Sequence, residues 1–315
     1  MKPVVVLGVS RSGTTLLKAM LDAHSQLAIP SESYFLPQLW DRHGARTRRD
    51  AFVDDLRRLA KIREWGVDPD EVARRLPERP AFSEAVQAIY RVYADARGKP
   101  GFGDKTPLYL QHLDVLERAF PDARYVHIVR DGRDAALSLL AMTRRPRLNL
   151  ARPRGIGDFA CAWSREVGAA RRFGRDHSYL ELRYEDLVAE PEARLREVCA
   201  FLGLEYEPGM LEYHRREDPA LHADHPRLAQ PPVPDTRSWR RELGTREAEL
   251  FESIAGDTLS ELGYERAYPR PGRRVRAALE RAAYAARAWI WSTALPLVRR
   301  SPAWRLRQVY IRGSR

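Results

Sequence analysis

The chain has 315 residues, of which 44% are hydrophobic and 31% charged, and its formal net charge is +11. These values are ordinary for a soluble globular protein made of one large α/β domain with an appendage. Two cysteines, Cys161 and Cys199, exclude a disulfide scaffold and lack metal-ligand spacing, so we expect buried thiols. Since the N-terminus enters a strand without a charged and apolar leader, we expect a cytoplasmic protein.

The positive charge is concentrated at the C-terminal end. Residues 269–315 hold twelve Arg, no Lys and one acid, Glu280, which accounts for the whole net charge. Residues 1–268 are therefore charge-balanced. We expect a main domain over 1–268 and a separable basic tail over 269–315.

Buried strands followed by helices recur along the main domain, which is typical of a parallel sheet flanked by helices. The strands are expected at 3–8, 27–30, 100–105, 125–130 and 179–184, and the helices at 14–23, 108–119, 132–143 and 191–202. Helical patterns alone fill about 50–97, including AFVDDLRRLAKI and a helix start at Asp68-Pro69. We expect a helical insert over one rim of the sheet, which either contributes to the specificity of a site there or only packs on the sheet.

Two long loops rich in Pro, Arg and His are expected at 145–157 and 214–238. Loops of this length are often functional lids. His214, His222 and His225 have no acidic or cysteine partner with ligand spacing, so we expect solvated histidines and no metal site.

The stretch GVSRSGTT (8–15) joins the first strand to the first helix. Gly8 and Gly13 have the spacing of the nucleotide-triphosphatase loop, but Thr14 stands where that loop has its lysine. Backbone N–H groups and the positive end of a helix dipole bind anions in such a turn. Further donors come from Arg11, Ser12, Thr14 and Thr15. The loop predicts a site for a terminal phosphate without bound Mg²⁺.

A second phosphate site is predicted where the 125–130 strand ends. Arg130 lies at the carboxyl end of this strand and Ser138 on an early turn of the next helix. Ligands of open α/β sheets bind at these strand ends, so both side chains can converge on one phosphate. The alternative is that Arg130 and Asp131 only form an ion pair at the helix start.

The two motifs together, RSGTTLL and VRDGRDAALS with its Arg and Ser eight apart, resemble the sulfotransferase family. The resemblance is closest to the tyrosylprotein-sulfotransferase-like branch, which includes many bacterial enzymes, and covers about residues 3–265. Further matching stretches are KAMLDAH, PSES, GDKTP, RYEDL with FLGL, and SWRREL. The resemblance implies a P-loop-like α/β fold and transfer of a sulfuryl group from 3′-phosphoadenosine 5′-phosphosulfate (PAPS) to an acceptor hydroxyl, with no metal required.

The resemblance also implies roles for individual residues. The residues that would bind the 5′-phosphosulfate are Arg11, Ser12, Gly13, Thr14 and Thr15. Arg130 and Ser138 would bind the 3′-phosphate, and Tyr184 would lie near the adenosine. Arg240 and Arg241 match loosely a segment that closes over the nucleotide. The family places another Arg shortly after the helix serine; Met142 occupies that position here, with Arg144 and Arg145 nearby, so this contact is not assigned.

Glu32 matches the glutamate that serves as general base in this branch, and Arg11 is counted with the catalytic residues. His24 and His112 are rival bases, and a structural carboxylate is a third interpretation. Lys105 would stabilise charge that develops on the sulfuryl group and the bridging oxygen. The alternative is a plain surface ion pair between Asp104 and Lys105.

The tail predicts an amphipathic helix over 273–293. Its apolar face comprises Val275, Leu279, Ala282, Ala286, Trp289 and Thr293, and the opposite face Arg273, Arg274, Arg276, Arg281 and Arg287. This pattern is typical of peripheral binding to an anionic membrane, here its inner face. The alternatives are a helix packed on the domain with a solvated Arg face, or a homodimer contact. No nucleic-acid-binding module is recognised.

Two other functions remain open. A P-loop-type ATP-dependent kinase would need Mg²⁺ and a loop lysine, and a non-catalytic nucleotide-binding adaptor at a membrane would tolerate loss of Glu32 and Lys105. The acceptor of a sulfotransferase would be a glycan, a glycolipid or a small alcohol or phenol.

Overall fold

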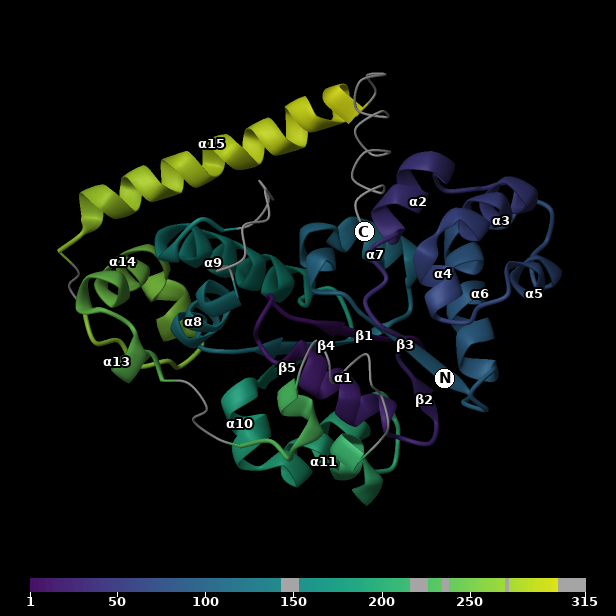
Figure 1. Cartoon of the computed structure of the whole chain (residues 1–315), viewed down its shortest axis with the longest axis horizontal. Helices are drawn as coiled ribbons and strands as arrows, with labels where there is room; N and C mark the ends of the chain where they lie inside the picture. The colour runs from purple at the N-terminus through teal and green to yellow at the C-terminus, as the bar shows by residue number, and fades with distance from the viewer. Residues whose placement is uncertain (143–152, 216–225, 234–237, 270–271, 300–315) are drawn as a thin grey trace. The chain divides into compact units, whose positions relative to one another are not determined.

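Figure 1 shows the computed structural model, which describes residues 1–142, 153–215, 226–233, 238–269 and 272–299. The chain forms two compact units. The first comprises Met1–Asp131 and Glu166–Arg237, and the second comprises Gly132–Arg165 and Ser238–Arg315. The division at residue 268 that the charge distribution suggests stays a prediction.

The first unit is built on a five-stranded parallel sheet with the order β2-β3-β1-β4-β5. The strands are β1 (Val4–Leu7), β2 (Leu27–Ala28), β3 (Gly101–Lys105), β4 (Arg124–Val129) and β5 (Tyr179–Arg183). The predicted parallel sheet flanked by helices is thus confirmed. Because β1 lies between β3 and β4, the loop after β1 lies at the switch point where α/β sheets bind ligands.

One face of the sheet is covered by α1 (Thr14–Asp22), α10 (Tyr184–Ala189) and α11 (Pro191–Leu202), as Figure 1 shows. Alternate residues of the strands point to this face and form one apolar core with the helices. The turn η2 (Pro208–Arg215) packs into the same core. Its strand members include Val4, Val6, Val126 and Ile128. Cys199 lies in the same core, and burial raises the pKa of its thiol to about 11. The expectation of buried free thiols is confirmed for both cysteines.

The expected helical insert is present beside β3. It comprises α3 (Arg49–Arg58), α4 (Ala60–Glu64), α5 (Pro69–Arg74) and α6 (Phe82–Asp95), preceded by α2 (Leu36–His43), which the sequence did not indicate. AFVDDLRRLAKI is not one helix, because Leu59 is extended and separates α3 from α4. Asp68 caps α5 by accepting a hydrogen bond from the Asp70 backbone N–H, as its position before Pro69 predicts.

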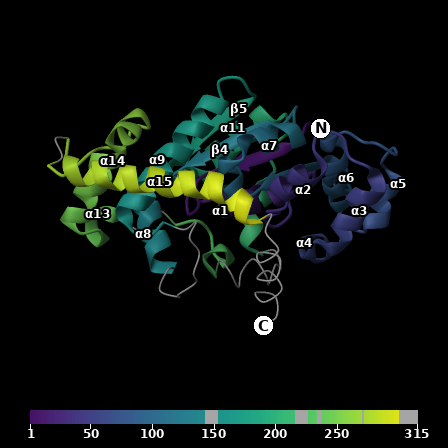
Figure 2. The same ribbon diagram turned by 90° about the horizontal axis from the view of Figure 1, so that it is seen from above.

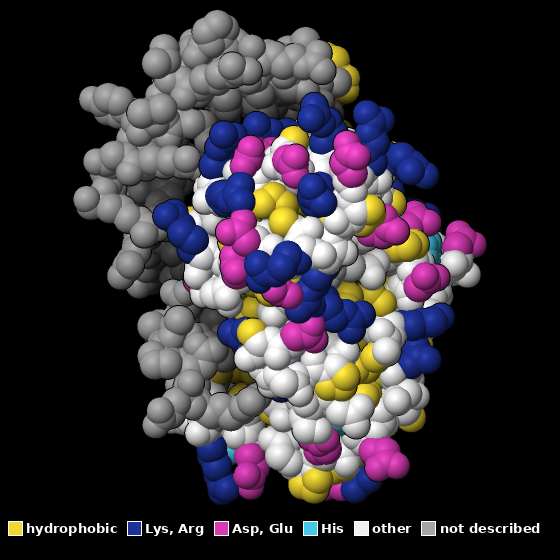
Figure 3. Space-filling view, turned by 90° about the vertical axis from the view of Figure 1, so that its right-hand side faces the viewer, with side chains coloured by type: hydrophobic (Ala, Val, Ile, Leu, Met, Phe, Trp, Pro, Cys, Tyr) yellow, Lys and Arg dark blue, Asp and Glu magenta, His cyan; other side chains and the backbone are white. Residues whose placement is uncertain are grey.

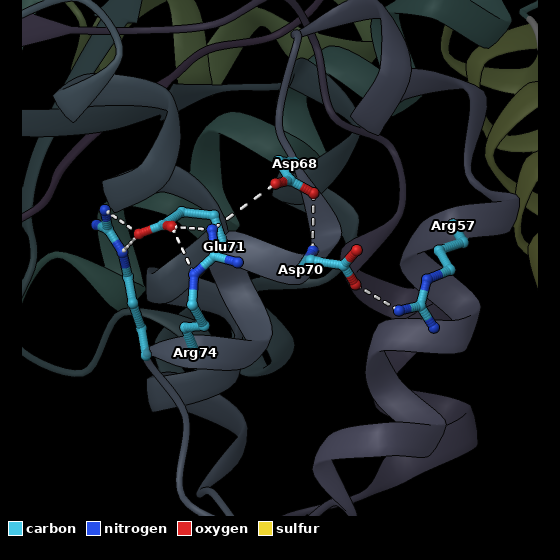
Figure 4. Close-up of polar contacts among 6 residues, drawn as sticks. Arg57, Asp68, Asp70, Glu71 and Arg74 are labelled. Carbon is cyan, nitrogen blue, oxygen red and sulfur yellow. Dashed lines mark hydrogen bonds and ion pairs between the residues drawn. The ribbon is translucent and has the colours of Figure 1, made fainter.

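Ion pairs connect α5 to its surroundings (Figure 4). Arg57 of α3 donates to Asp70 at 2.5 Å, and Glu71 accepts from Arg74 within α5. Acidic and basic side chains alternate over the face of the molecule that Figure 3 shows, as on an ordinary solvated surface. Exposed pairs of this kind contribute little to stability, because water screens both charges.

The chain leaves β3 through η1 (Pro107–Gln111) and α7 (Leu113–Ala119), which together replace the single helix expected at 108–119. The second unit contains α8 (Gly132–Met142), α13 (Trp239–Glu242), α14 (Thr245–Glu261), α15 (Arg274–Arg299) and the first part of α9 (Ile156–Phe173). The start of α9 lies within the loop expected at 145–157. Part of the loop expected at 214–238 forms η3 (Pro226–Ala229).

The second arginine of VRDGRD has a structural position in the second unit. Arg133 and Glu252 form a fully buried ion pair at 2.6 Å. Glu252 also accepts hydrogen bonds from the backbone N–H groups of Ala267 and Tyr268. The Arg133 guanidinium lies 3.8 Å from the centroid of the Trp239 ring. Arg133 therefore holds α8, α13 and α14 together, and removing either charge would leave the other buried without its opposite charge.

Candidate functional site

The loop after β1 has two residues in the left-handed region, Arg11 with φ 75° and Gly13 with φ 93°. This conformation favours glycine, and it costs free energy at Arg11. A Cβ atom on Gly13 would lie 2.3 Å from the Tyr184 ring, so no larger residue fits there. The loop is therefore pressed against the start of α10, and RYEDL and RSGTT belong to the same site.

Two buried donors at this loop lack a hydrogen-bond partner among the described residues. They are the Ser12 hydroxyl and the Nε atom of Arg130. The Arg130 guanidinium lies 4.6 Å from the centroid of the Tyr184 ring, and its Nη1 atom donates to the Arg11 carbonyl at 3.4 Å. Unsatisfied buried donors are uncommon in native proteins, and an anion that accepts from both would satisfy them. The predicted phosphate-binding residues of the first unit thus fit an anionic ligand.

Arg130 and Asp131 contact different parts of the site. Arg130 contacts Arg11 and Tyr184, and the Asp131 backbone N–H donates to the Glu185 carboxylate at 3.0 Å. The RYEDL stretch therefore supports Arg130 through Tyr184 and fixes the following turn through Glu185.

The two predicted catalytic side chains are in contact. Lys105 Nζ, at the end of β3, donates to Glu32 Oε1 at 2.6 Å and to Thr15 Oγ1 at 3.3 Å. The Lys105 side chain is only 4% exposed and that of Glu32 is 25% exposed. Burial lowers the pKa of Lys105 below its ordinary value, and the neighbouring Glu32 carboxylate opposes this shift. Lys105 is therefore not a surface residue, and it connects Glu32 to the first turn of α1.

The KAMLDAH stretch leads the chain from α1 to Glu32. Asp22 accepts from the Ile29 backbone N–H at 2.8 Å. Both ring nitrogens of the fully buried His24 bond to backbone, Nε2 to the Glu205 carbonyl and Nδ1 to the Gln26 N–H. His24 thus has a structural role that occupies both nitrogens. His112, half-buried between η1 and α7, remains the other rival base.

A buried polar network connects Ser33, which follows Glu32, to the two residues on either side of Lys105. The sequence did not predict this network. The Asp104 carboxylate accepts from the hydroxyls of Ser33 at 2.8 Å and Tyr90 at 2.7 Å. The Ser33 backbone N–H donates to Thr106 Oγ1 at 3.0 Å, and the Ser33 and Tyr109 hydroxyls are 2.6 Å apart. These contacts hold the two segments together and so hold Glu32 beside Lys105. The only sequence signal was the presence of Ser and Asp inside PSES and GDKTP.

This network predicts a pH dependence of stability. Burial raises the pKa of Asp104 from 3.8 to about 6. Between these values the folded state binds more protons than the unfolded state, so the free energy of unfolding should fall as pH rises through this window, by at most about 3 kcal/mol. Urea unfolding measured from pH 4 to about 7 checks this, with the wild type compared with Asp104→Asn, which cannot titrate.

The comparison with Asp104→Asn removes the contributions of all other titrating groups, because both proteins share them. The wild type should lose more stability than Asp104→Asn over the window. Equal pH profiles for the two proteins would mean that Asp104 does not titrate as its burial indicates.

The remaining predicted site residues lie in the second unit or outside the described residues. Ser138 is buried in α8, and Arg240 pairs with Glu265 at 2.7 Å within the same unit. Because Arg130 belongs to the first unit, its convergence with Ser138 stays a prediction. The residues that lie outside the described ranges are Arg144, Arg145, His222 and His225. Within those ranges no three His, Cys, Asp or Glu residues are grouped to hold a metal ion.

The sequence was also compared with models of known protein families. A model of the sulfotransferase family matches residues 3–208, about two thirds of the chain. This chain belongs to the sulfotransferase family. The matched range includes the first loop, Glu32, Lys105, Arg130, Ser138 and Tyr184, whereas Arg240 lies beyond it.

Individual relatives agree with this membership. Protein-tyrosine sulfotransferase 1 of Danio rerio is 28% identical over 220 residues, which are 67% of this chain and 55% of the relative. The nodulation protein NoeE of Sinorhizobium fredii is 29% identical over 289 residues, 82% of this chain and 65% of the relative. The chain thus spans about half to two thirds of the length of these relatives. The sulfotransferase domain of the Synechococcus PCC 7002 olefin synthase shares the fold, with a TM-score of 0.50, 24% identity, and coverage of 81% of this chain and 94% of that domain.

Proposed function

We propose that this chain transfers the sulfuryl group of PAPS to the hydroxyl of an acceptor. The observation that carries the proposal is the position of Lys105, whose Nζ atom bonds to Glu32 and to Thr15 at the start of α1. A buried cation that contacts both a carboxylate and the anion-binding loop suits a reaction in which an acceptor loses a proton while negative charge moves onto a leaving oxygen.

The residues proposed to hold the 5′-phosphosulfate are Arg11, Ser12, Gly13, Thr14 and Thr15. Arg130 and Ser138 are proposed to hold the 3′-phosphate, with Tyr184 near the adenosine. The unpaired Ser12 hydroxyl and Arg130 Nε support these roles, because each is a buried donor available to an anion. When bound, PAPS supplies the sulfuryl group and leaves as adenosine 3′,5′-bisphosphate.

Glu32 is proposed to accept the proton of the acceptor hydroxyl. Its carboxylate is partly exposed while its partner Lys105 is buried, so an acceptor can reach Glu32. Lys105 and Arg11 then stabilise charge on the transferring group and on the bridging oxygen. A sulfuryl group carries less charge than a phosphoryl group, so side-chain cations suffice for this role and no metal is invoked.

The acceptor is proposed to be a glycan, a glycolipid or a small alcohol or phenol. The insert is next to the proposed base, since Ser31, directly before Glu32, donates to Glu64 of α4 at 2.9 Å and accepts from Trp65 Nε1 at 2.9 Å. The insert therefore lies close enough to the proposed base to contribute to acceptor binding.

Calorimetric titration with adenosine 3′,5′-bisphosphate, ADP and ATP tests the nucleotide. We expect the bisphosphate to bind more tightly than ADP by about 10- to 100-fold, because charge-assisted hydrogen bonds to the 3′-phosphate contribute about 1.5–3 kcal/mol. Arg130→Ala should remove this preference and leave the affinity for ADP nearly unchanged.

Tighter binding of ADP or ATP than of the bisphosphate would overturn the proposal in favour of a kinase. Binding of the bisphosphate without turnover of any hydroxyl acceptor, in a screen of glycans, glycolipids and phenols with PAPS, would favour a non-catalytic adaptor.

A further inference from the structure

Helix α15 turns its arginine face toward its own unit. Arg281 donates to the carbonyls of Ser253 and Ile254 on α14 at 2.9 and 2.8 Å. Arg273 pairs with Glu249 of α14 at 3.0 Å, and Arg287 pairs with Asp158 of α9. Figures 1 and 2 both show α15 alongside α14. The helix is therefore packed on its own unit, as one of the alternatives expected, and Arg273, Arg281 and Arg287 make the packing contacts.

The apolar face of α15 consequently points away from the unit. Val275 is 78% exposed, Leu279 66%, Trp289 67% and Ile290 53%. On a helical wheel these four side chains lie within a single sector together with the exposed Ala282 and Ala286. We call these six residues the outer face of α15. A contiguous stripe of large apolar side chains on a solvent-exposed helix marks an interaction surface.

We propose that the outer face of α15 binds the surface of an anionic lipid bilayer. The chemistry is that of an interfacial helix, with an apolar stripe that includes a Trp and exposed cations beside it. Arg274 and Arg276 are exposed at the edges of the stripe. Because the contacts to α14 and α9 hold the helix in place, the stripe is presented to lipid without a change of its orientation.

Charge favours lipid over a second copy of the chain as the occupant. The segment 269–315 carries a net charge of +11, and residues 299–315 alone contribute six Arg and no acid. A symmetric dimer through the outer face would bring two such segments together, and their like charges would repel. An anionic leaflet attracts them instead, by about 1 kcal/mol for each Arg near the surface.

The proposed attachment is peripheral. Among the described residues no helix is long and apolar enough to cross a membrane. The outer face occupies one side of α15 only, while the other side contacts α14 and α9, so the helix would lie in the plane of the interface. This inference does not depend on the proposed enzymatic activity.

Co-sedimentation of the full chain with vesicles tests the inference. The wild type should bind vesicles of phosphatidylcholine and phosphatidylserine, and high salt should weaken this binding by screening the charges. The double variant Leu279→Glu/Trp289→Glu should bind about 100-fold more weakly, because two large side chains no longer enter lipid. Val233→Glu is the matched control, since Val233 is 56% exposed but lies in the first unit, and it should bind like the wild type.

Both substituted positions of the double variant are mostly exposed, and thermal unfolding of each protein shows whether folding is retained. Equal binding of the wild type and the double variant would overturn the inference, as would equal binding of the wild type to vesicles of phosphatidylcholine alone. A wild type that binds no vesicles and sediments as a dimer, with a monomeric double variant, would show that a second copy covers the outer face instead.

Discussion

Replacing Glu32 by glutamine is expected to lower kcat by about 10²- to 10⁴-fold, the range for loss of a general base. Glutamine has nearly the same shape and keeps an oxygen that can accept from Lys105 Nζ, so the 2.6 Å contact can persist without the carboxylate. The affinity for adenosine 3′,5′-bisphosphate should stay unchanged, because Glu32 is not among the residues proposed to hold the nucleotide. Single-turnover rates with PAPS and calorimetry with the bisphosphate measure the two effects separately.

The chain offers a matched control for this substitution in Glu64. Glu64 also accepts from a lysine at 2.6 Å, Lys61, and it lies close to the site through Ser31, but both partners are more exposed. Glu64→Gln should therefore turn over at nearly the wild-type rate. If Glu32→Gln kept wild-type turnover, Glu32 would be a structural carboxylate, and His112 would be the next base to test.

Replacing Lys105 by alanine is expected to lower kcat by about 10²- to 10³-fold, comparable to loss of one donor to a developing anion. The expected loss is large because Lys105 is buried, and charge interactions are stronger away from water. Lys61→Ala removes an equivalent exposed lysine and should change turnover little.

The pH dependence of turnover tests the role of Lys105 independently of its substitution. Burial lowers its pKa below 10.5, and it must be protonated to act, so turnover should decline with rising pH at a value below 10.5. Glu32 raises the pKa of Lys105, so the residual turnover of Glu32→Gln should decline at a still lower pH. A pH profile of kcat that is flat up to 10.5, or a turnover by Lys105→Ala close to that of Lys61→Ala, would remove Lys105 from the mechanism.

The local patterns of the sequence were sufficient to predict the parallel sheet and the position of the turn after its first strand. Strand β1 is a short apolar run, and the glycines of GVSRSGTT identify the turn between β1 and α1 directly. Boundaries were less accurate where a single residue changes the backbone, as at Leu59, whose extended conformation divides a continuous helical pattern.

The sequence alone could not distinguish the roles of side chains of the same type. VRDGRD contains two arginines three residues apart, and only the structure shows that Arg130 contacts the anion-binding loop while Arg133 pairs with the buried Glu252. Likewise His24 resembles a candidate base until both of its nitrogens are seen to bond to backbone.

The sequence by itself determined the family resemblance, the parallel sheet and the identity of the candidate phosphate-binding and catalytic residues, because each depends on residues close together along the chain. Only the tertiary structure decided that Glu32 and Lys105, 73 residues apart, are in contact, and that Ser33 and Asp104 hold them there. It also decided which face of α15 is exposed. A helical wheel separates the two faces, but the contacts of Arg281 and Arg287 with distant carbonyls and carboxylates choose the one that points outward.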